Sequence, residues 1–439
     1  MDFLIPCAAV LKRFYHEPAK NLKLLLSHKL DHLKSEENLQ GVTRTVYGVI
    51  RYRRLLDFVI QRFSSRPLNE IQPDVLILLN IGTYLLLFSK SYPDYAVISE
   101  IVRVASRQSS GFINAILRNI ARNRESLYET IKSIPDPEIA FSVSKVIVEN
   151  LSLVSSDVEH DLEYLNCEPL FHLRVNTAVT TYNEARALLE KHQIRFKELE
   201  PFNSFEIKES GRVIRELMEK RYFYFQNTGS QVVSILAAQY AEKRVLDCCA
   251  APGTKSVTTS LLKPSLMVFA SDINPGRTRL IRDFVSQYQV GAIYPLVSDA
   301  ANIAIKTGPK PAVDFVIVDA PCTSSGTLRK NPDLKLKIDQ SLIDSNAENQ
   351  YNILCSVLRL APRYILYSVC SFTKNETEDV LEKFDRSYRD TKNTGLNTLD
   401  LSQELDLLGF RYKKGRYGFY LLPDERLNND IFYISLLQI

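Results

Sequence analysis

Two cysteines in the last third of the chain are the first candidates for covalent chemistry. Cys322 ends the segment DAPC, and Cys370 lies in YSVCS at the end of the strand-like run 364–370. A thiolate is a strong nucleophile, although a single buried cysteine at a strand end is more often a small apolar side chain. Two thiols that each follow a strand predict nucleophilic catalysis at one edge of a sheet.

The other residues limit what these thiols can do. All six histidines precede residue 193, which excludes a Cys-His or Ser-His-Asp mechanism in the second half of the chain. The seven cysteines form no CxxC pair and lack the Cys/His spacing of a zinc site, so no disulfide framework or structural metal is indicated. The amino-terminal stretch has no basic leader with a cleavage site, and we expect a cytoplasmic protein with reduced thiols.

Strand-like runs alternate with helix-like segments from about residue 226 onward. Such alternation predicts a mostly parallel sheet with helices on both faces, in which ligands bind at the carboxyl ends of the strands. Four of the runs end in aspartate, so we expect these carboxylates to gather along one edge. A reading of all four as helix caps is the alternative, and it is improbable for four residues in register. The runs cover residues 244–247, 266–272, 292–299 and 313–319, ending in Asp247, Asp272, Asp299 and Asp319.

A run of small residues, CCAAPGTK, follows Asp247 and opens a helix. Small side chains let a ligand approach the backbone, and a helix N-terminus offers free N–H groups to a carboxylate. Asp272 suits two ribose hydroxyls, and Asp299 suits the exocyclic amine of an adenine. Because the GxGxxG fingerprint is absent, we expect an adenosine ligand without a pyrophosphate, which acts as a methyl donor near the thiols.

The 439 residues predict two or three domains, and 45% hydrophobic with 24% charged residues is typical of a folded, soluble chain. Residues 1–140 show helical periodicity, 145–225 read as a small α+β module, and 226–439 form the alternating domain. The apolar run 75–88 lies between two prolines and is too short for a membrane span, so it predicts a buried helix.

Arginine is concentrated in the amino-terminal part of the chain. Residues 41–66 carry six arginines and one acid, with Tyr47 and Tyr52 between them, and Arg118, Arg122 and Arg124 follow. Arginine forks match phosphate oxygens, so this pattern favours RNA contact, with a solvated helix face as the alternative. The later basic residues Arg329, Lys330, Lys335 and Lys337 are weaker candidates for phosphate contact.

Four segments resemble, in order, the motifs of the NOL1/NOP2/Sun family of RNA cytosine-5 methyltransferases: DCCAAPGTKS, SDINPGRTRLI, DAPCTSSGTLRKNPD and YSVCSFTKNETE. The resemblance implies a Rossmann-like class I methyltransferase domain that uses S-adenosylmethionine. It assigns the attacking thiol to Cys370, the release step to Cys322 and contact with N3 of the base to Asp319. Thr254 and Thr323-Ser324 depart from the family pattern, which has a glycine at the first position and Ser-Gly at the second. The cofactor-binding residues implied are Cys249, Ala250, Ala251, Pro252, Gly253, Thr254, Lys255, Asp272, Arg277, Asp299 and Asp319.

Three earlier segments look like a NusB-type helical RNA-binding domain, which precedes the catalytic domain in the family branch that acts on bacterial small-subunit rRNA: YGVIRYRRLLDFVI, LLNIGTYLLLFSK and GFINAILRNI. The expected substrate is therefore a loop cytosine in 16S rRNA, free or in an assembly precursor. A tRNA substrate, or a non-catalytic RNA-binding protein related to antitermination factors, remains the alternative. We expect a monomer that binds neither membrane nor DNA.

Overall fold

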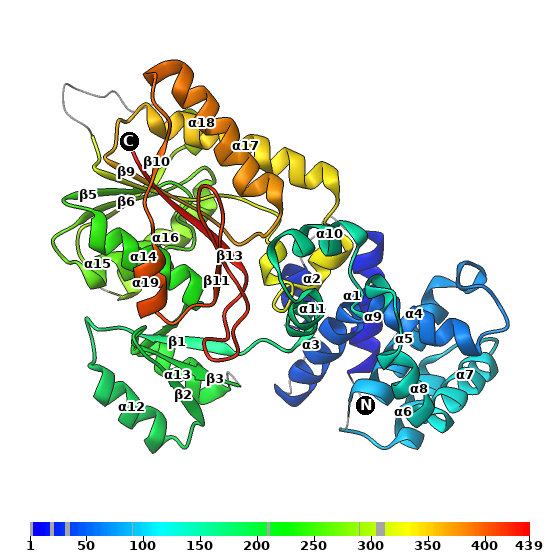
Figure 1. The fold of residues 1–439 in the computed structure, drawn as a ribbon. Coiled ribbons are helices and arrows are strands. Elements are labelled where there is room, and N and C mark those ends of the chain that lie inside the picture. Colours follow the sequence, from blue (N-terminus) through cyan, green and yellow to red (C-terminus); the bar gives the residue numbers. More distant parts are fainter. Residues whose placement is uncertain are drawn as a thin grey trace. The chain divides into compact units, whose positions relative to one another are not determined.

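The computed structural model describes residues 3–17, 22–30, 36–89, 91–208, 211–288, 290–303 and 312–439 (Figure 1). The chain divides into two compact units. One unit comprises Met1–Val148 together with Asn331–Ile338, and the other comprises Glu149–Lys330 and Asp339–Ile439. The inclusion of residues 331–338 in the amino-terminal unit differs from the sequence prediction, which placed them in the catalytic domain.

The amino-terminal unit is helical, as predicted. At its centre lies α5 (Pro73–Phe88), which begins with proline at its first position and buries residues on all sides. A side chain at Gly48 would place a Cβ 2.0 Å from the Tyr84 ring, so α3 can approach α5 closely only because residue 48 is glycine. The other helices are α1 (Leu4–His16), α2 (Leu22–Leu30), α3 (Glu36–Arg51), α4 (Arg53–Phe63), α6 (Asp94–Val104), α7 (Ser110–Arg122), α8 (Arg124–Lys132) and α9 (Pro137–Ala140).

No helix in the described ranges is both long and apolar enough to cross a membrane.

The second unit begins within α10 (Lys145–Val154) and continues with α11 (Val158–Asn166) and a four-stranded antiparallel sheet in the order β2-β3-β1-β4. This sheet has its own apolar core, to which α12 contributes Ala185 and Leu189. Its elements are β1 (Phe171–Val175), α12 (Tyr182–Lys191), β2 (Phe196–Leu199), β3 (Ser204–Ile207), α13 (Arg212–Glu219) and β4 (Phe223–Phe225).

A nine-stranded sheet forms the carboxy-terminal part of the second unit. Five strands are parallel in the order β9-β8-β5-β6-β7, and each lies within a predicted run. They are β5 (Arg244–Asp247), β6 (Met267–Asp272), β7 (Ile293–Val297), β8 (Phe315–Asp319) and β9 (Tyr364–Val369).

Four more strands complete this sheet at its other edge. The strand β13 (Phe432–Gln438) runs antiparallel to β9 and carries β12 (Phe419–Leu421), β11 (Tyr412–Lys414) and β10 (Asn397–Thr398). Antiparallel pairing of β12 with β13 forms a hairpin.

Helices cover the parallel strands. The helices α14 (Thr228–Tyr240), α15 (Thr254–Leu262) and α16 (Pro275–Tyr288) lie together on one side, and α17 (Gln340–Leu358) and α18 (Glu378–Lys392) pack on the other (Figure 1). A short helix, α19 (Ser402–Leu407), precedes β11. This is the predicted Rossmann-like arrangement, with helices on both faces of a mostly parallel sheet.

Candidate active site

The four aspartates identified in the sequence lie at the carboxyl ends of adjacent strands. Asp247, Asp272 and Asp319 are the last residues of β5, β6 and β8, and Asp299 follows β7 by two residues. Because β8, β5, β6 and β7 are neighbours in that order and run parallel, these carboxylates follow one edge of the sheet. The edge is where a ligand of this fold binds.

Asp247 is fully buried at this edge. Its Oδ2 accepts a hydrogen bond of 2.7 Å from Ser256, whereas no described residue makes a well-formed hydrogen bond to Oδ1. Burial raises the pKa of Asp247 to about 6, and the Ser256 hydrogen bond opposes that rise only in part. A buried carboxylate oxygen without a donor fits a ligand that brings its own polar group.

Replacement of Asp247 by asparagine is expected to stabilise the ligand-free protein at pH 8. The pKa of Asp247 is higher in the folded protein than in the unfolded chain. Ionisation of Asp247 therefore costs the folded protein no stability below about pH 4, and the cost is complete once the pH has risen through about 6. Removal of the ionisable group should add about 3 kcal/mol to the free energy of unfolding at pH 8, with little difference near pH 4. Urea unfolding at both pH values measures this.

Asp385 offers a matched control because it is also buried but accepts hydrogen bonds from Leu396 N–H and Tyr417 O–H. Its pKa is lowered: burial raises it, but the Arg389 ion pair and these hydrogen bonds outweigh the burial. Asp385→Asn should therefore lose stability at pH 8. If Asp247→Asn also loses stability at pH 8, the claim that burial leaves the Asp247 carboxylate poorly satisfied is wrong.

The small-residue loop after Asp247 reaches α15 through a glycine in the left-handed region. Gly253 has φ of +108° and caps α15, and a Cβ at this position would lie 3.3 Å from Ile281 Cγ2. Thr254, which replaces a family glycine, begins the helix and is not among the residues with positive φ. Burial raises the pKa of the Cys249 thiol, so this side chain contributes no charge to the loop.

The next two carboxylates are partly occupied by local contacts. Asp272 is buried, accepts from Asn274 N–H at 3.0 Å and lies 3.2 Å from Nη2 of the half-exposed Arg277. Asp299 is exposed, and its Oδ1 accepts from Ala301 N–H at 2.9 Å as the cap of a short 3₁₀ turn. The cap interpretation is thus correct for Asp299, although one of its oxygens stays available.

Lys255 and Asp319 form an ion pair at the end of β8, where Asp319 also accepts from Ser368 Oγ at 3.0 Å. Burial lowers the pKa of Lys255, but the negative charges of Asp319 and Asp247 outweigh burial and raise it. Lys255 is therefore a charged ammonium group held among carboxylates.

The two predicted thiols are in contact. Cys322 Sγ lies 3.4 Å from Cys370 Sγ, and Ser324 Oγ lies 3.3 Å from Cys370 Sγ. The hydrogen bond from Cys322 lowers the pKa of Cys370 against the effect of burial, with help from Ser324 and from the charge of Lys255. The same hydrogen bond, together with burial, raises the pKa of Cys322. Of the two thiols, Cys370 therefore loses its proton more readily than Cys322.

Ser324 is a site residue that sequence reasoning did not identify. It has φ of +57°, a left-handed conformation that a residue other than glycine adopts only under constraint. The family pattern has glycine at this position, which the conformation explains. The serine adds a hydroxyl beside the thiol, and no spacing in the sequence shows where that hydroxyl points.

The later basic residues do not form the phosphate-binding run that we considered. Arg329 and Lys335 are 3% and 1% exposed. Lys335 Nζ donates to the backbone oxygens of Arg51 and Phe141, at 3.1 and 2.8 Å. Lys330 is paired with Asp430 and Lys337 with Asp333. These cations are used inside the fold, which corrects the prediction.

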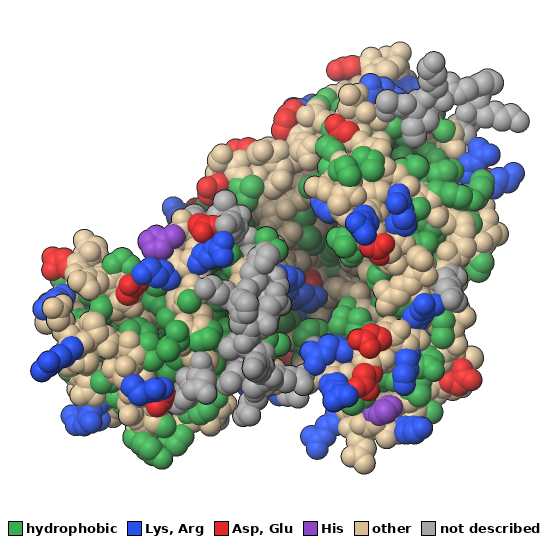
Figure 2. All heavy atoms as spheres, turned by 180° about the vertical axis from the view of Figure 1, so that it is seen from behind, with side chains coloured by type: hydrophobic (Ala, Val, Ile, Leu, Met, Phe, Trp, Pro, Cys, Tyr) green, Lys and Arg blue, Asp and Glu red, His purple; other side chains and the backbone are tan. Residues whose placement is uncertain are grey.

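The arginine-rich segment 41–66 is also only partly available. Arg51 is buried, Arg53 is paired with Asp57, and Arg54 with Glu138. The exposed members are Arg44, Arg62 and Arg66. On the face that Figure 2 shows, lysine and arginine side chains are scattered among acidic and apolar ones and form no single stripe. Local ion pairs, which composition does not reveal, account for the difference.

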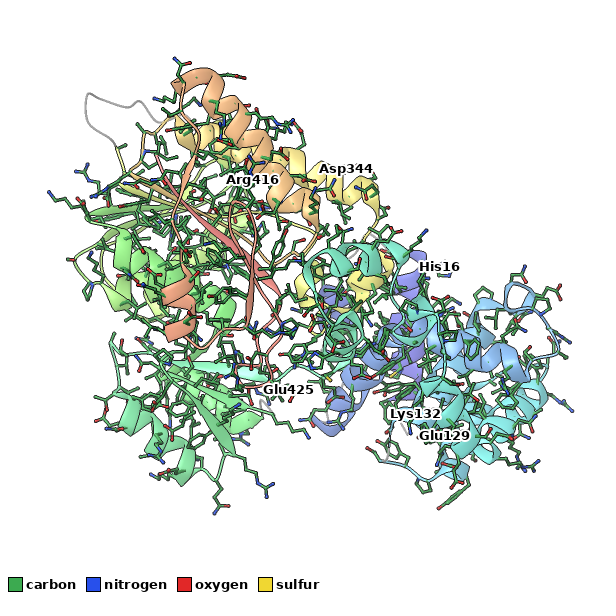
Figure 3. All side chains as sticks on the ribbon, viewed as in Figure 1. His16, Glu129, Lys132, Asp344, Arg416 and Glu425 are labelled. Carbon is green, nitrogen blue, oxygen red and sulfur yellow. The ribbon has the colours of Figure 1, made fainter. Side chains whose placement is uncertain are left out.

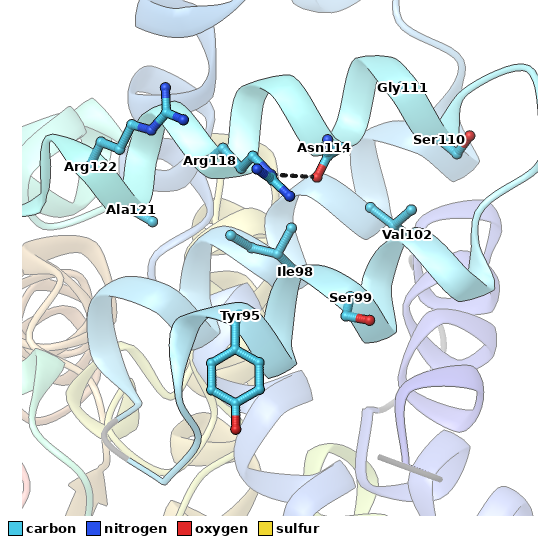
Figure 4. A pocket seen from close by; sticks show the side chains of 10 residues that line it. All are labelled: Tyr95, Ile98, Ser99, Val102, Ser110, Gly111, Asn114, Arg118, Ala121 and Arg122. Atoms are coloured by element: carbon cyan, nitrogen blue, oxygen red, sulfur yellow. Dashed lines mark hydrogen bonds between the residues drawn. The ribbon is translucent and has the colours of Figure 1, made fainter.

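A groove of about 640 Å³ runs between α6 and α7 of the amino-terminal unit. Figure 4 shows Ile98 of α6 facing Arg118 of α7, whose Nε donates to Asn114 Oδ1 at 3.0 Å, while the ring of Tyr95 points away from α7. Tyr95 is 77% exposed, and none of the described lining residues is acidic. The lining side chains are Tyr95, Ile98, Ser99, Val102, Ser110, Asn114, Arg118, Ala121 and Arg122. The third arginine of the predicted group, Arg124, is instead paired with Asp94.

Comparisons with known proteins agree with this architecture. The family model described as 16S rRNA methyltransferase RsmB/F matches residues 233–438, and the NusB family model matches residues 8–122. The chain is 25% identical to the probable ribosomal RNA small subunit methyltransferase B of Bacillus subtilis, over 88% of each chain. It is also 25% identical to ribosomal RNA small subunit methyltransferase B of Pasteurella multocida, over 96% of this chain and 93% of the relative.

Among solved structures, PH0851 matches 97% of this chain and 96% of its own length, with a TM-score of 0.72 and 21% identity. NSun6 from Pyrococcus horikoshii, determined with SFG, covers 67% of this chain and 98% of its own, with a TM-score of 0.55 and 16% identity. These two likenesses establish the fold. The two family models, the relatives and the edge of carboxylates together identify a carboxy-terminal S-adenosylmethionine-dependent methyltransferase domain that is similar to the RsmB/F family of 16S rRNA methyltransferases, and a NusB domain at the amino terminus.

Proposed function

We propose that this enzyme transfers a methyl group to C5 of a cytosine in 16S rRNA through a covalent bond between Cys370 Sγ and C6 of the base. The observation that carries the proposal is the 3.4 Å contact between Cys370 and Cys322, which lowers the pKa of Cys370 and raises that of Cys322. Only the thiolate can attack carbon, so the electrostatics favour Cys370 as the nucleophile.

The need for a nucleophile follows from the base itself. C5 of cytosine is a poor nucleophile because its electrons are delocalised in the ring. Addition of the thiolate to C6 moves an electron pair onto C5, which can then form a carbon–carbon bond with a methyl group. S-adenosylmethionine, when bound, supplies that methyl group on a sulfonium centre.

Charge that develops at N3 needs a proton or a hydrogen bond. Asp319 lies at the same strand ends as the thiols and holds the ammonium group of Lys255. We propose that Asp319 contacts N3 and that Lys255 lends the proton through this carboxylate. A pre-organised ion pair beside the reacting ring stabilises the adduct without further reorganisation.

Release of the product requires a base for the C5 proton, and Cys322 suits this step. Its pKa is raised first by the hydrogen bond with Cys370, then by burial and by the charges of Cys370 and Glu376. Once Cys370 is bonded to C6, its sulfur carries no negative charge and no longer forms the hydrogen bond with Cys322. Two causes of the raised pKa are then absent, and Cys322 ionises more easily. Its thiolate takes the C5 proton, the C5–H electrons form the C5–C6 double bond, and the C6–S bond breaks to return the Cys370 thiolate. N3 gives its proton back through Asp319 to Lys255, so the product leaves as neutral 5-methylcytosine.

The residues around the carboxylate edge fit the cofactor. Asp247 Oδ1 has no well-formed hydrogen bond among the described residues, so a ligand can donate to it. The loop that follows reaches α15 through the left-handed Gly253, and its small side chains do not block a ligand. We propose that residues 249–255 hold the amino-acid part, that Asp272 and Arg277 contact the ribose side, and that Asp299 accepts from the adenine amine through its free oxygen. Asp319 closes the same edge beside the thiols.

We further propose that the α6–α7 groove contacts the rRNA. An exposed tyrosine can stack on a base, and two arginines in a lining that includes no acidic residue attract phosphates. The double variant Arg118→Ala/Arg122→Ala is expected to weaken binding of 16S rRNA roughly tenfold at 0.15 M salt. The slope of log K against log salt should also become shallower by about 2, because two phosphate contacts are lost. Filter binding over a salt series measures both quantities.

Lys132→Ala provides a matched control for charge. Lys132 pairs with Glu129 on the surface of α8, outside the groove (Figure 3). Its replacement should leave affinity and slope near those of the wild type. Equal losses in the control and in the double variant would show that the amino-terminal unit attracts RNA only through its overall charge.

Bisulfite mapping of total RNA from cells with and without the protein tests the proposed function. One 16S rRNA cytosine is expected to lose protection in the deleted strain and to regain it on complementation. A change in tRNA alone would move the substrate to that class, and no change in any RNA would contradict methyl transfer to C5 of cytosine.

A further inference from the structure

Glu376 lies behind the two thiols and is not among the residues predicted from the sequence. It ends the 3₁₀ turn Lys374–Glu376 after β9, and its side chain is fully buried. A buried carboxylate is costly unless it is well satisfied. The residues that satisfy Glu376 come from both cysteine loops.

The first loop is held through Thr323, the residue directly after Cys322. Thr323 N–H donates to Glu376 Oε1 at 2.7 Å, and Thr323 Oγ1 donates to Oε2 at 2.5 Å. A backbone donor fixes the loop itself and not only a side chain. The position of Cys322 is thereby tied to this carboxylate.

The second loop is held through Ser371, the residue directly after Cys370. Ser371 Oγ donates to Glu376 Oε2 at 2.6 Å, and Thr373 Oγ1 donates to the same oxygen at 2.7 Å. Gln350 of α17 completes the set, since its amide lies 3.3 Å from Oε1 and donates to Pro321 O at 2.9 Å. Five donors thus converge on one carboxyl group, whose two oxygens offer about four lone-pair positions.

The two loops also contact each other through main-chain atoms. Gly326 N–H donates to Cys370 O at 3.0 Å, and Phe372 N–H donates to Ser325 Oγ at 3.0 Å. A Cβ on Gly326 would lie 1.9 Å from Ile431 O and 3.2 Å from Cys370 O, so no side chain fits at this position. Glu376 adds hydrogen bonds to Thr323 and Ser371, the residues that follow each thiol.

We propose that Glu376 is a positioning residue, whose carboxylate holds the loops of Cys322 and Cys370 so that the two sulfur atoms stay in hydrogen-bond contact. It touches neither sulfur and acts through Thr323 and Ser371. The proposal rests on the proposed function in one respect only: the contact between the sulfur atoms matters because Cys370 attacks C6 of the cytosine. The pKa of Cys370 supports it, because the hydrogen bond from Cys322 is the largest cause of its lowering.

The test measures the thiol directly in the purified full-length protein without RNA. The rate at which iodoacetamide alkylates Cys370 is followed against pH by peptide mass spectrometry. In Glu376→Gln, which keeps the size but presents an amide to donor groups, the titration of Cys370 should move to higher pH. Alkylation at pH 7 should then be about tenfold slower, since the thiolate fraction below the pKa falls tenfold per pKa unit. The rate of methyl transfer is expected to fall in parallel.

Two further variants separate positioning from general loss of stability. Ser371→Ala removes one donor to Glu376 and should produce a smaller shift in the same direction. Asp385→Asn removes a buried carboxylate that touches neither cysteine loop, and it should lower the melting temperature without moving the Cys370 titration.

An unchanged titration in both Glu376→Gln and Ser371→Ala would overturn the proposal, as would equal shifts in Asp385→Asn. If the titration moves as expected but Cys370→Ala still methylates RNA, the positioning role of Glu376 is supported and the covalent mechanism is wrong.

Discussion

Replacement of Cys370 by alanine is expected to reduce methyl transfer to 16S rRNA by at least about a thousandfold. Without the thiolate, C5 keeps its aromatic electrons and cannot attack the methyl group, and the remaining groups only bind and orient the substrates. Transfer of tritium from labelled S-adenosylmethionine to rRNA measures the loss. Binding of the cofactor, followed by calorimetry, should change little, because the cofactor edge does not depend on this sulfur.

Cys355 on α17 supplies the matched control for that experiment. It is partly exposed and lies outside the residues that we assign to the reaction. Cys355→Ala should keep activity near that of the wild type. If Cys370→Ala retains a substantial part of the activity while Cys355→Ala behaves normally, attack by Cys370 is excluded.

Replacement of Cys322 by alanine is expected to have a different result, namely accumulation of a covalent protein–RNA complex. Attack and methyl transfer still occur, but the C5 proton has no base and the Cys370–C6 bond cannot be broken. Turnover should fall at least about a hundredfold while one equivalent of RNA becomes attached, since general-base steps contribute about that much. Denaturing gels with labelled rRNA detect the complex.

The double variant Cys322→Ala/Cys370→Ala controls for non-covalent retention and should form no complex. Normal turnover by Cys322→Ala without a complex would mean that another group removes the C5 proton. The loss of the Cys322 hydrogen bond should also raise the pKa of Cys370, so the complex is expected to form faster at pH 9 than at pH 7.

The sheet and its carboxylate edge could be predicted from the sequence because they depend on local pattern. Runs such as 313–319 are apolar and bounded by polar residues, which is typical of strands buried on both faces. Parallel strands place their carboxyl ends together, so Asp247 and Asp319 had to share an edge once the strands were assigned. The thiols at the same ends followed for the same reason.

The fate of individual charged side chains could not be predicted, since it depends on partners far away in the sequence. Lys335 meets the backbone oxygen of Arg51, and Arg54 meets Glu138. A composition count treats these cations as free charges, but the folded chain uses them as internal donors. The same limit applies to Glu376, whose five donors come from residues 323 to 373 and are brought together only by the sheet.

The placement of residues 331–338 in the amino-terminal unit was also outside the reach of sequence reasoning. The segment begins within the motif that contains Cys322, and its basic residues made it a weaker candidate for phosphate contact. Burial of Lys335 instead requires the segment to enter the helical unit, where two backbone carbonyls satisfy its amine. No local pattern distinguishes such a buried lysine from a solvated one.

Mass spectrometry of the complex trapped by Cys322→Ala tests the central claim most directly. The complex is formed with 16S rRNA and S-adenosylmethionine, digested with protease and nuclease, and the modified peptide is sequenced. Our account predicts a cytidine carrying one added methyl group, attached to the peptide at Cys370. Attachment at any other residue, or a methylated product that never passes through a protein-bound state, would contradict it.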